Sequence, residues 1–191
     1  HYVEGQTLRE FLSMAPMSCE EAVRIIVAVA DGLQHAHEHH VIHRDVKPGN
    51  ILIEEKTGKV FITDFGLAVH SHRAEFSTEF AGTPGYMSPE QARCESHRVD
   101  ARSDIFSLGS VFYLLLTGSR AFAGSNVGDL IQQVISAEPR PPRELKPEIP
   151  DVLERICQKA MAKKASDRFP SAKAMAEALQ TWQEKWKPQQ F

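Results

Sequence analysis

The sequence lacks the features that mark several classes of protein. Its 191 residues include three cysteines, Cys19, Cys94 and Cys157, and no C-x-x-C pair. Zinc ribbons and dithiol redox motifs need such pairs, so we expect three reduced thiols in a cytosolic protein. No apolar run is long enough to span a bilayer, and the opening HYVEGQTLREF lacks the basic-then-apolar pattern of a signal peptide.

An excess of charge of one sign is also missing. The chain has 22 Lys and Arg against 25 Asp and Glu, which gives a net charge of −3. General nucleic-acid binders present a basic surface, so we expect no nucleic-acid partner. Hydrophobic residues make up 42% of the chain, which is enough for one domain with its own core.

Apolar periodicity predicts a mostly helical domain. One helix should begin near Ser18, and its apolar positions have helical spacing: Ala22, Ile25, Ile26, Val29, Leu33 and Ala36. Residues 104–117 are apolar on nearly every side, so this helix should lie buried in the middle of the domain and stop at Gly118. Two last helices should cover 151–163 and 171–186, with Trp182 and Trp186 packing from one face.

A few short strands should accompany the helices. The β-prone runs 51–53 and 60–62 flank residues 55–59, which have the composition of a hairpin turn. Residues 70–88 should form an extended loop. Residues 139–150 are rich in proline and contain a literal P-x-x-P, which indicates either an inter-helix connector or a docking ligand. The expected fold class is α+β and mainly helical.

Five histidines fall between residues 35 and 43, and they raise the question of a metal site. His35, Glu38 and His39 form a literal H-x-x-E-H, the signature of one class of zinc peptidases. On a helix at about 100° per residue, however, His35 and His39 point away from the apolar stripe and toward solvent. A zinc enzyme is therefore the weakest of the functional hypotheses. His37 falls at the edge of the stripe, where a buried histidine is expected.

The residues after this run resemble the motifs of protein kinases. HRDVKPGN at residues 43–50 is similar to the catalytic loop of that family, and DFG follows at 64–66. GTPGYMSPE at 82–90 is similar to the segment that ends in A-P-E. Three motifs in the right order and spacing are far more specific than any one of them. The segments K-P-G-N, Y-M-S-P-E-Q and R-S-D-I-F-S-L-G most resemble those of bacterial-type serine/threonine kinases.

The resemblance implies a site for ATP and Mg²⁺. Asp45 would accept or orient the proton of the substrate hydroxyl, and Lys47 would stabilise the transferring phosphate. Asn50 and Asp64 would hold magnesium through hard oxygen ligands. His1 and Val3 would bind the adenine ring through their backbone, and Leu52 would lie beneath the ring.

The resemblance also implies the acceptor and a mode of regulation. Lys47 together with Thr83 is typical of serine/threonine-directed members of the family. Arg44 precedes the catalytic aspartate, as in kinases whose activation loop is phosphorylated and then pairs with this arginine. Ser77 and Thr78 are the candidate phosphosites, and the alternative is that they are ordinary loop hydroxyls.

Other matches carry structural roles. Glu90 resembles the glutamate that pairs with a late arginine, here Arg168. Asp104, expected to open the apolar helix, resembles the aspartate that holds the backbone amides of the catalytic loop. His43 and Phe65 match residues that stack in the family. The sequence departs mildly from the pattern in two places, with Ser88 for the alanine of A-P-E and Phe106 for a common tryptophan.

The resemblance covers residues 1–186 and begins in the hinge between the two kinase lobes, so 187–191 would be a tail. The sequence contains no G-x-G-x-x-G. We therefore expect a large C-terminal lobe whose partners are protein substrates and a missing N-terminal lobe, and which is inactive alone. It would work in the cytoplasm, free or as part of a membrane-anchored kinase. The alternative is a non-catalytic, pseudokinase-like docking module.

Overall fold

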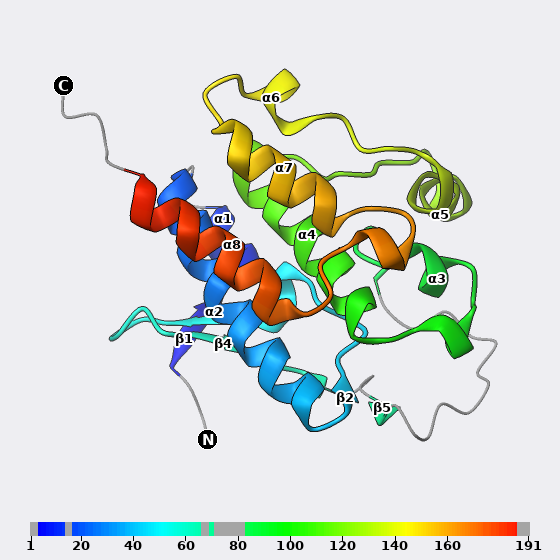
Figure 1. The fold of residues 1–191 in the computed structure, drawn as a ribbon, viewed down its shortest axis with the longest axis horizontal. Helices are drawn as coiled ribbons and strands as arrows, with labels where there is room; N and C mark the ends of the chain where they lie inside the picture. The colour runs from blue at the N-terminus through cyan, green and yellow to red at the C-terminus, as the bar shows by residue number, and fades with distance from the viewer. Residues whose placement is uncertain (1–3, 14–16, 66–68, 71–82, 187–191) are drawn as a thin grey trace.

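The computed structural model describes residues 4–13, 17–65, 69–70 and 83–186 (Figure 1). Helices dominate these ranges, as the sequence predicted. The α-helices are α1 Leu8–Leu12, α2 Cys19–Glu38, α3 Pro89–Ala92, α4 Ala101–Thr117, α5 Val127–Ser136, α6 Pro142–Leu145, α7 Asp151–Ala160 and α8 Ala172–Lys185. The strands are β1 Gly5–Thr7, β2 Val41–Ile42, β3 Ile51–Glu54, β4 Val60–Ile62 and β5 Val69–His70. Single 3₁₀ turns occur at η1 Pro48–Asn50, η4 Ser96–Arg98 and η5 Ala165–Asp167.

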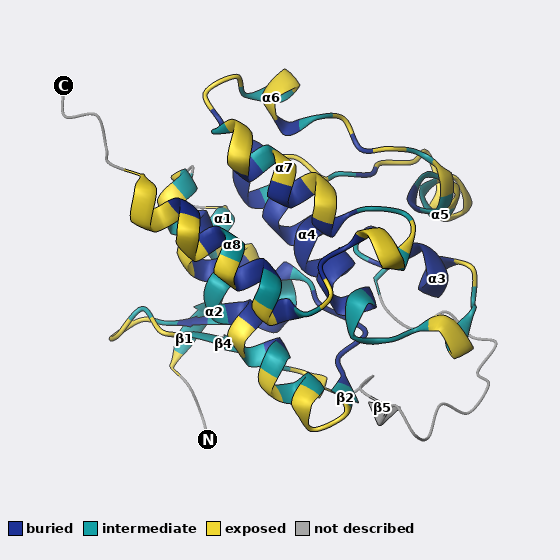
Figure 2. Ribbon diagram, viewed as in Figure 1, coloured by how far each residue is buried: buried dark blue, intermediate teal, exposed yellow. Residues whose placement is uncertain are grey.

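Helix α4 forms the centre of the domain and packs against α2, α6, α7 and α8. Figure 2 shows it buried along almost its whole length, as its apolar sequence predicted. It ends at Gly118, whose left-handed φ of 76° is one that glycine adopts at little cost. Its start was predicted wrongly. The Asp100 side chain accepts a hydrogen bond from the Arg102 amide and caps the helix, so Asp104 is the fourth helical residue.

Helix α2 lies beside α8 on one flank of α4 (Figure 1). Ser18 caps it by accepting a hydrogen bond from the Glu21 amide, at 3.1 Å. Trp182 and Trp186 do share a face, with their rings stacked at 5.3 Å. Trp182 is buried, whereas Trp186 is 40% exposed and is held by a hydrogen bond from its Nε1 to Glu20, at 2.7 Å.

The expected hairpin is confirmed. Strands β3 and β4 pair antiparallel with Ile51 opposite Ile62, and β1 extends the sheet in the order β1–β3–β4. Just beyond this hairpin the Thr63 amide donates to the Asn50 carbonyl at 2.9 Å. A second pair, β2 with β5, sets Val41 opposite His70. The two pairings bring both ends of the catalytic-loop motif beside the segment that contains the DFG motif.

Some elements were not expected from the sequence. Helices α1, α3 and α5 are short, and each begins at a capping side chain rather than within a long apolar pattern. The proline-rich stretch 139–150 connects α5 to α7, and it contains the short helix α6. Pro139 and Pro142 are both buried, so the P-x-x-P motif is not presented as a docking ligand. The described part of the chain contains no helix with the length and hydropathy needed to cross a membrane.

An ion pair between Glu90 of α3 and Arg168 connects the end of the 82–90 motif to the helical core. The guanidinium donates to both carboxylate oxygens of Glu90, at 2.7 and 2.9 Å. Its other donors reach the carbonyls of Arg102, Ala162 and Lys163, at 3.0, 2.8 and 3.1 Å. All five donors of a side chain that is only 3% exposed are therefore satisfied.

The same pair controls the titration of Glu90. Burial by itself would raise the pKa of this carboxyl group. The hydrogen bonds and positive charge of Arg168, with a hydrogen bond from Ser103 at 2.6 Å, outweigh burial, and the pKa is lowered below its usual value of 4.5. The ionised pair therefore stabilises the fold above about pH 4.5, and this contribution is lost as pH falls through the lowered pKa.

We expect Glu90→Gln to lower the free energy of unfolding by about 3–5 kcal/mol at pH 7, because it leaves the buried Arg168 without a counter-charge. Urea unfolding followed by circular dichroism measures this, and the loss should shrink below pH 4.5, where the wild type also loses the charge. Glu95→Gln is the matched control, because Glu95 forms only a surface pair with Arg98 at 3.4 Å. It should cost less than about 1 kcal/mol. Equal losses of unfolding free energy for the two variants would contradict this role of the Glu90–Arg168 ion pair.

Candidate active site

A buried carboxylate fixes the backbone of the catalytic loop. Asp104 is fully buried, and its oxygens accept hydrogen bonds from the backbone amides of His43 and Arg44, at 2.9 and 2.8 Å. Arg44 has a left-handed φ of 69°, which costs free energy in a non-glycine residue. The two hydrogen bonds to Asp104 hold this turn in place, and they thereby fix the backbone direction at Asp45, the next residue.

A third donor to this carboxylate was not expected from the sequence. The His37 Nε2 lies 2.7 Å from Asp104 Oδ2 and reaches it from α2. His37 was predicted only to be a buried histidine, and its partner was not identified. The one signal in the sequence was its position at the edge of the apolar stripe, six residues before His43.

His43 serves as a packing residue, and its hydrogen bonds define its tautomer. Its Nδ1 accepts a hydrogen bond from the Asp45 amide at 3.2 Å, so in the neutral ring the proton is on Nε2. Nε2 then donates to the Thr63 carbonyl at 2.9 Å. The ring also packs against Phe65, with centroids 4.6 Å apart. His43 thus joins the catalytic loop to the segment that carries Asp64.

Asp45, Lys47 and Thr83 form a closed hydrogen-bonded group. The Lys47 ammonium donates to Asp45 Oδ2 and, at 2.9 Å, to Thr83 Oγ1. The Thr83 hydroxyl donates in turn to Asp45 Oδ1, also at 2.9 Å. Asp45 is 8% exposed, so its carboxylate is held in one orientation with a cation beside it.

Asn50 lies next to this group, and Asp64 is the second proposed oxygen ligand. Asn50 Nδ2 donates to the carbonyl and to Oδ2 of Asp45, at 2.9 and 3.2 Å. Among the described residues no donor reaches Asn50 Oδ1, which leaves this oxygen available to a cation. Asp64 is exposed and has a left-handed φ of 61°, and it follows Thr63, which is hydrogen-bonded to the Asn50 backbone. Two hard oxygen donors at one end of a hairpin suit Mg²⁺.

The remaining nucleotide and regulatory residues are only partly described. Leu52 is half-buried in β3, where it lies between Thr7 of β1 and Phe61 of β4. The other candidates for adenine binding and phosphorylation lie outside the described residues: His1, Val3, Ser77 and Thr78.

Arg44 carries a buried guanidinium with unused donors. The side chain is 8% exposed, and within the described residues its Nε and Nη2 have no hydrogen-bond partner. Burial lowers the pKa of Arg44, and the negative charge of Asp104 partly offsets this effect. Such a group is a candidate receptor for an anion.

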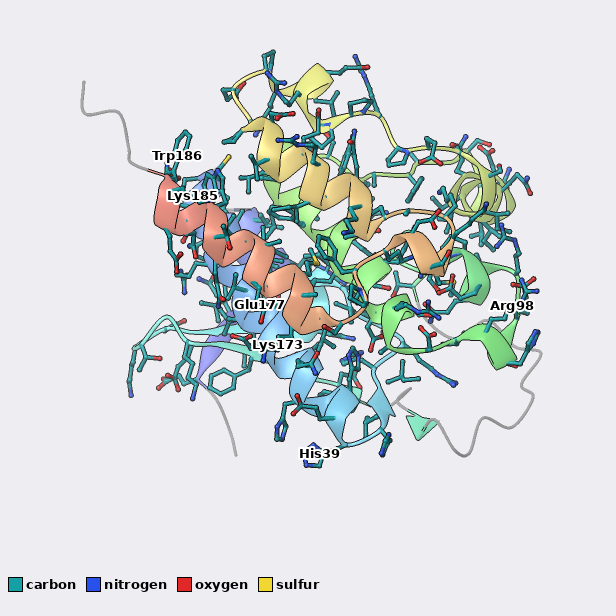
Figure 3. All side chains as sticks on the ribbon, viewed as in Figure 1. His39, Arg98, Lys173, Glu177, Lys185 and Trp186 are labelled. Carbon is teal, nitrogen blue, oxygen red and sulfur yellow. The ribbon has the colours of Figure 1, made fainter. Side chains whose placement is uncertain are left out.

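The H-x-x-E-H residues lie away from this site. His35, Glu38 and His39 are exposed at the end of α2, as the helical geometry predicted, and Figure 3 shows His39 pointing outward there. His39 Nδ1 donates to the His35 carbonyl at 2.8 Å, and the two rings lie 4.5 Å apart. In the ranges that the structure describes, no three His, Cys, Asp or Glu side chains are grouped as metal ligands.

Known proteins have sequences similar to this chain. A family model described as the protein kinase domain matches residues 1–183. The chain is 39% identical over 176 residues to a probable serine/threonine-protein kinase PknB of Bifidobacterium longum, which covers 90% of this chain and 25% of that protein. It is 40% identical over 171 residues to the tyrosine-protein kinase MasK of Myxococcus xanthus, covering 84% and 26%. It is 35% identical over 183 residues to the serine/threonine-protein kinase PrkC of Bacillus subtilis, covering 94% and 28%.

The chain therefore spans about a quarter of the length of these relatives. Its helical fold, its short antiparallel strands and the position of the match agree with the large C-terminal lobe of a kinase. By its motifs, its fold and these similarities, the chain belongs to the protein kinase family, as a member of the bacterial type.

Proposed function

We propose that this chain is the catalytic lobe of a serine/threonine protein kinase, which transfers the γ-phosphate of ATP to hydroxyl groups of protein substrates. One observation supports this most directly: the closed hydrogen-bonded group of Asp45, Lys47 and Thr83, extended by Asn50. The retention of all these side chains argues against a pseudokinase-like docking module. Because ATP and reduced thiols belong to the cytoplasm, we place the reaction there, in a free or a membrane-anchored kinase.

Each residue has a role that follows from its chemistry. Asp45, an oriented carboxylate, accepts the proton of the attacking hydroxyl at one of its oxygens. Lys47 places a positive charge beside the point of transfer and favours the negative charge that develops there. Asn50 and Asp64 would hold magnesium, which when bound neutralises phosphate charge and orients ATP. Phosphoryl transfer needs mainly such positioning and charge neutralisation.

Thr83 bears on the choice of acceptor. Its hydroxyl contacts both Lys47 and Asp45, at 2.9 Å each, and so borders the position where the substrate hydroxyl must lie. The names of the relatives differ, since two are serine/threonine-protein kinases and one is a tyrosine-protein kinase. We propose serine/threonine specificity for this chain on the pairing of Lys47 with Thr83.

The reaction is tested with the protein that contains these residues within a complete kinase domain. We expect ATP- and Mg²⁺-dependent phosphorylation of serine and threonine peptides, and none of matched tyrosine peptides. Asp45→Asn should lower kcat by about 10²- to 10⁴-fold, because the proton acceptor is lost. Asp31→Asn removes the same charge from the exposed face of α2 and should leave kcat unchanged. Phosphotyrosine as the sole product would refute the acceptor assignment.

We also propose that residues 1–191 alone turn over little or no ATP. Kinases of this family need a glycine-rich loop and a strand lysine to hold the phosphates, and this sequence contains no G-x-G-x-x-G. Isothermal titration of the 191-residue chain with Mg·ATP should show no binding at millimolar concentration, and a phosphorylation assay should show no turnover. Robust turnover by this chain would contradict the proposal.

Arg44 is proposed to sense phosphorylation at Ser77 or Thr78. Its buried, unused donors would pair with a phosphate dianion. We expect mass spectrometry of the active protein to find phosphate on at least one of these residues, and Ser77→Ala with Thr78→Ala to lower activity about tenfold or more. Arg44→Gln should remove the difference between the phosphorylated and dephosphorylated protein. Activity that does not depend on phosphatase treatment would exclude this regulation.

A further inference from the structure

A cavity of about 430 Å³ lies where α3, η4 and the segment between α7 and α8 meet (Figure 1). Small-ligand sites in proteins have volumes of about 300–1,000 Å³, so this cavity is large enough for a ligand. None of the residues that hydrogen-bond to Asp45 lines it, so it is separate from the candidate active site. Its charged lining side chains are four cations and two carboxylates: Arg93, Arg98, Lys163, Lys164, Glu90 and Glu95.

Both carboxylates of the cavity already have a cationic partner. Glu90 accepts two hydrogen bonds from Arg168, at 2.7 and 2.9 Å, and is neutralised by it. Glu95 lies 3.4 Å from Arg98, and this pair shares one positive and one negative charge. Neither carboxylate is therefore left to balance the other cations of the cavity.

The remaining three cations have no carboxylate partner. Within the described ranges, Arg93, Lys163 and Lys164 form no ion pair, although ion pairs are present nearby at Glu90 and Glu95. Glu138 attracts Lys163 without forming an ion pair with it. The cavity thus has an excess of positive charge.

Lys163 is held in the cavity wall by neutral groups. Its ammonium donates to the Val134 carbonyl at 2.8 Å and lies 4.2 Å from the centre of the Phe122 ring. An ammonium has three donors, so hydrogen-bonding capacity remains after this contact. Burial lowers the pKa of Lys163 to about 8, because the surroundings do not fully compensate its charge. An anion in the cavity would supply this compensation.

Arg93 is held in a similar way at the end of α3. Its Nη2 donates to the Ile135 carbonyl at 3.2 Å. Val134 and Ile135 lie in the last turn of α5, where the carbonyl groups carry partial negative charge. This attraction explains two of the cations, but it uses one donor of each. Neither Lys164 nor Arg98 hydrogen-bonds to α5, so the helix end does not account for the whole set.

We propose that this cavity binds a phosphate monoester, carried by a phosphorylated side chain or by a small molecule. A phosphate monoester has about two negative charges and three strong acceptor oxygens, which suits three cations without partners. The Arg93 guanidinium can contact two of these oxygens, and the two lysines act as point charges. A carboxylate offers one charge and two oxygens, so it would compensate the cavity less well. The proposal does not depend on the proposed kinase function, because binding needs no turnover.

Isothermal titration calorimetry tests the binding on the protein with a complete kinase domain, without ATP. The protein carries Arg44→Gln, because Arg44 is the other proposed phosphate receptor. The probes are glycerol phosphate and three peptides that differ at one position, which is phosphoserine, glutamate or serine. We expect the phosphoserine peptide to bind about tenfold more tightly than the glutamate peptide, and the serine peptide not to bind.

The two phosphate probes distinguish the sources of the ligand. If the phosphoserine peptide binds more tightly than glycerol phosphate, the cavity receives a phosphorylated side chain. If glycerol phosphate binds more tightly, the cavity receives a small phosphorylated molecule.

Charge reversal at Lys164 assigns the binding to this cavity. Lys164→Glu should weaken binding of the tighter phosphate probe about tenfold, because a repulsion replaces an attraction. Lys164 is exposed and its side chain has no hydrogen bond to a described residue, so thermal unfolding should not change. Lys185→Glu is the matched control and should leave the affinity unchanged. Lys185 is exposed at the end of α8, and Figure 3 shows it on the opposite side of the molecule from Arg98.

A variant that strengthens binding separates a ligand site from a purely structural cluster. Glu95→Gln removes the carboxylate that competes for Arg98, so it should tighten phosphate binding about twofold to fivefold. Cations that served only to stabilise the end of α5 would show no such gain.

Three results would each overturn the proposal. The first is the absence of binding by both phosphate probes at millimolar concentration. The second is equal affinity for the phosphoserine and glutamate peptides. The third is an affinity of the Lys164→Glu variant equal to that of its parent, which would place the bound phosphate elsewhere on the protein.

Discussion

The buried carboxylate of Asp104 is the constraint on which the site depends. It lies in the first turn of α4, where the helix dipole favours negative charge, and it accepts three hydrogen bonds. A carboxylate removed from water is costly unless such donors surround it. Because two of the donors are backbone amides of His43 and Arg44, satisfying the carboxylate also sets the path of the catalytic loop. The position of Asp45, the proposed proton acceptor, thus depends on a side chain that is fully buried in the core.

The same principle links the segment from Thr83 to Glu90 to the core. Glu90 lies only seven residues after Thr83, and it is tied through Arg168 to the carbonyls at the ends of α4 and α7. The Arg168 guanidinium also lies over the Phe106 ring, at 5.0 Å, where kinases commonly have a tryptophan. A cation over an aromatic face is attractive with either ring, so the substitution to phenylalanine keeps this contact. The catalytic-loop motif and the segment from Thr83 to Glu90 are therefore positioned by two buried carboxylates, Asp104 and Glu90, on one helical core.

Much of this arrangement could be predicted from the sequence, because it depends on local patterns. The helix from Ser18, the hairpin at 51–62 and the central apolar helix follow from spacing and capping, which act over a few residues. The start of α4 was misplaced, because Asp100 caps the helix from outside the apolar run. Helices α1 and α5 were missed because they have no long apolar pattern; their capping residues, Thr7 and Asn126, were the only local signals.

Contacts between distant segments could be predicted only where the resemblance to the kinase family includes both residues of the contact. The pairing of Glu90 with Arg168 was expected in that way, although 78 residues separate them. The contact of His37 with Asp104 was not expected. Periodicity placed His37 at the edge of the apolar stripe, but it does not show which side chain of another helix His37 meets, since that depends on how α2 and α4 pack.

Two residues with left-handed backbone conformation show that parts of the candidate site are held in place by the surrounding structure. Arg44 and Asp64 both have positive φ, and strain of this kind is kept where surrounding structure over-determines it. At Arg44 the carboxylate of Asp104 supplies the compensation. At Asp64 the neighbours supply it, with Thr63 bonded to the Asn50 backbone and Phe65 packed on His43, while the Asp64 side chain stays exposed. The group around the proposed proton acceptor Asp45 is therefore held in one arrangement, whereas of the two proposed cation ligands Asn50 is buried and Asp64 is exposed. Because preorganised groups need no rearrangement during reaction, the proposed function implies that the free-energy cost of assembly falls on nucleotide binding rather than on the transfer step.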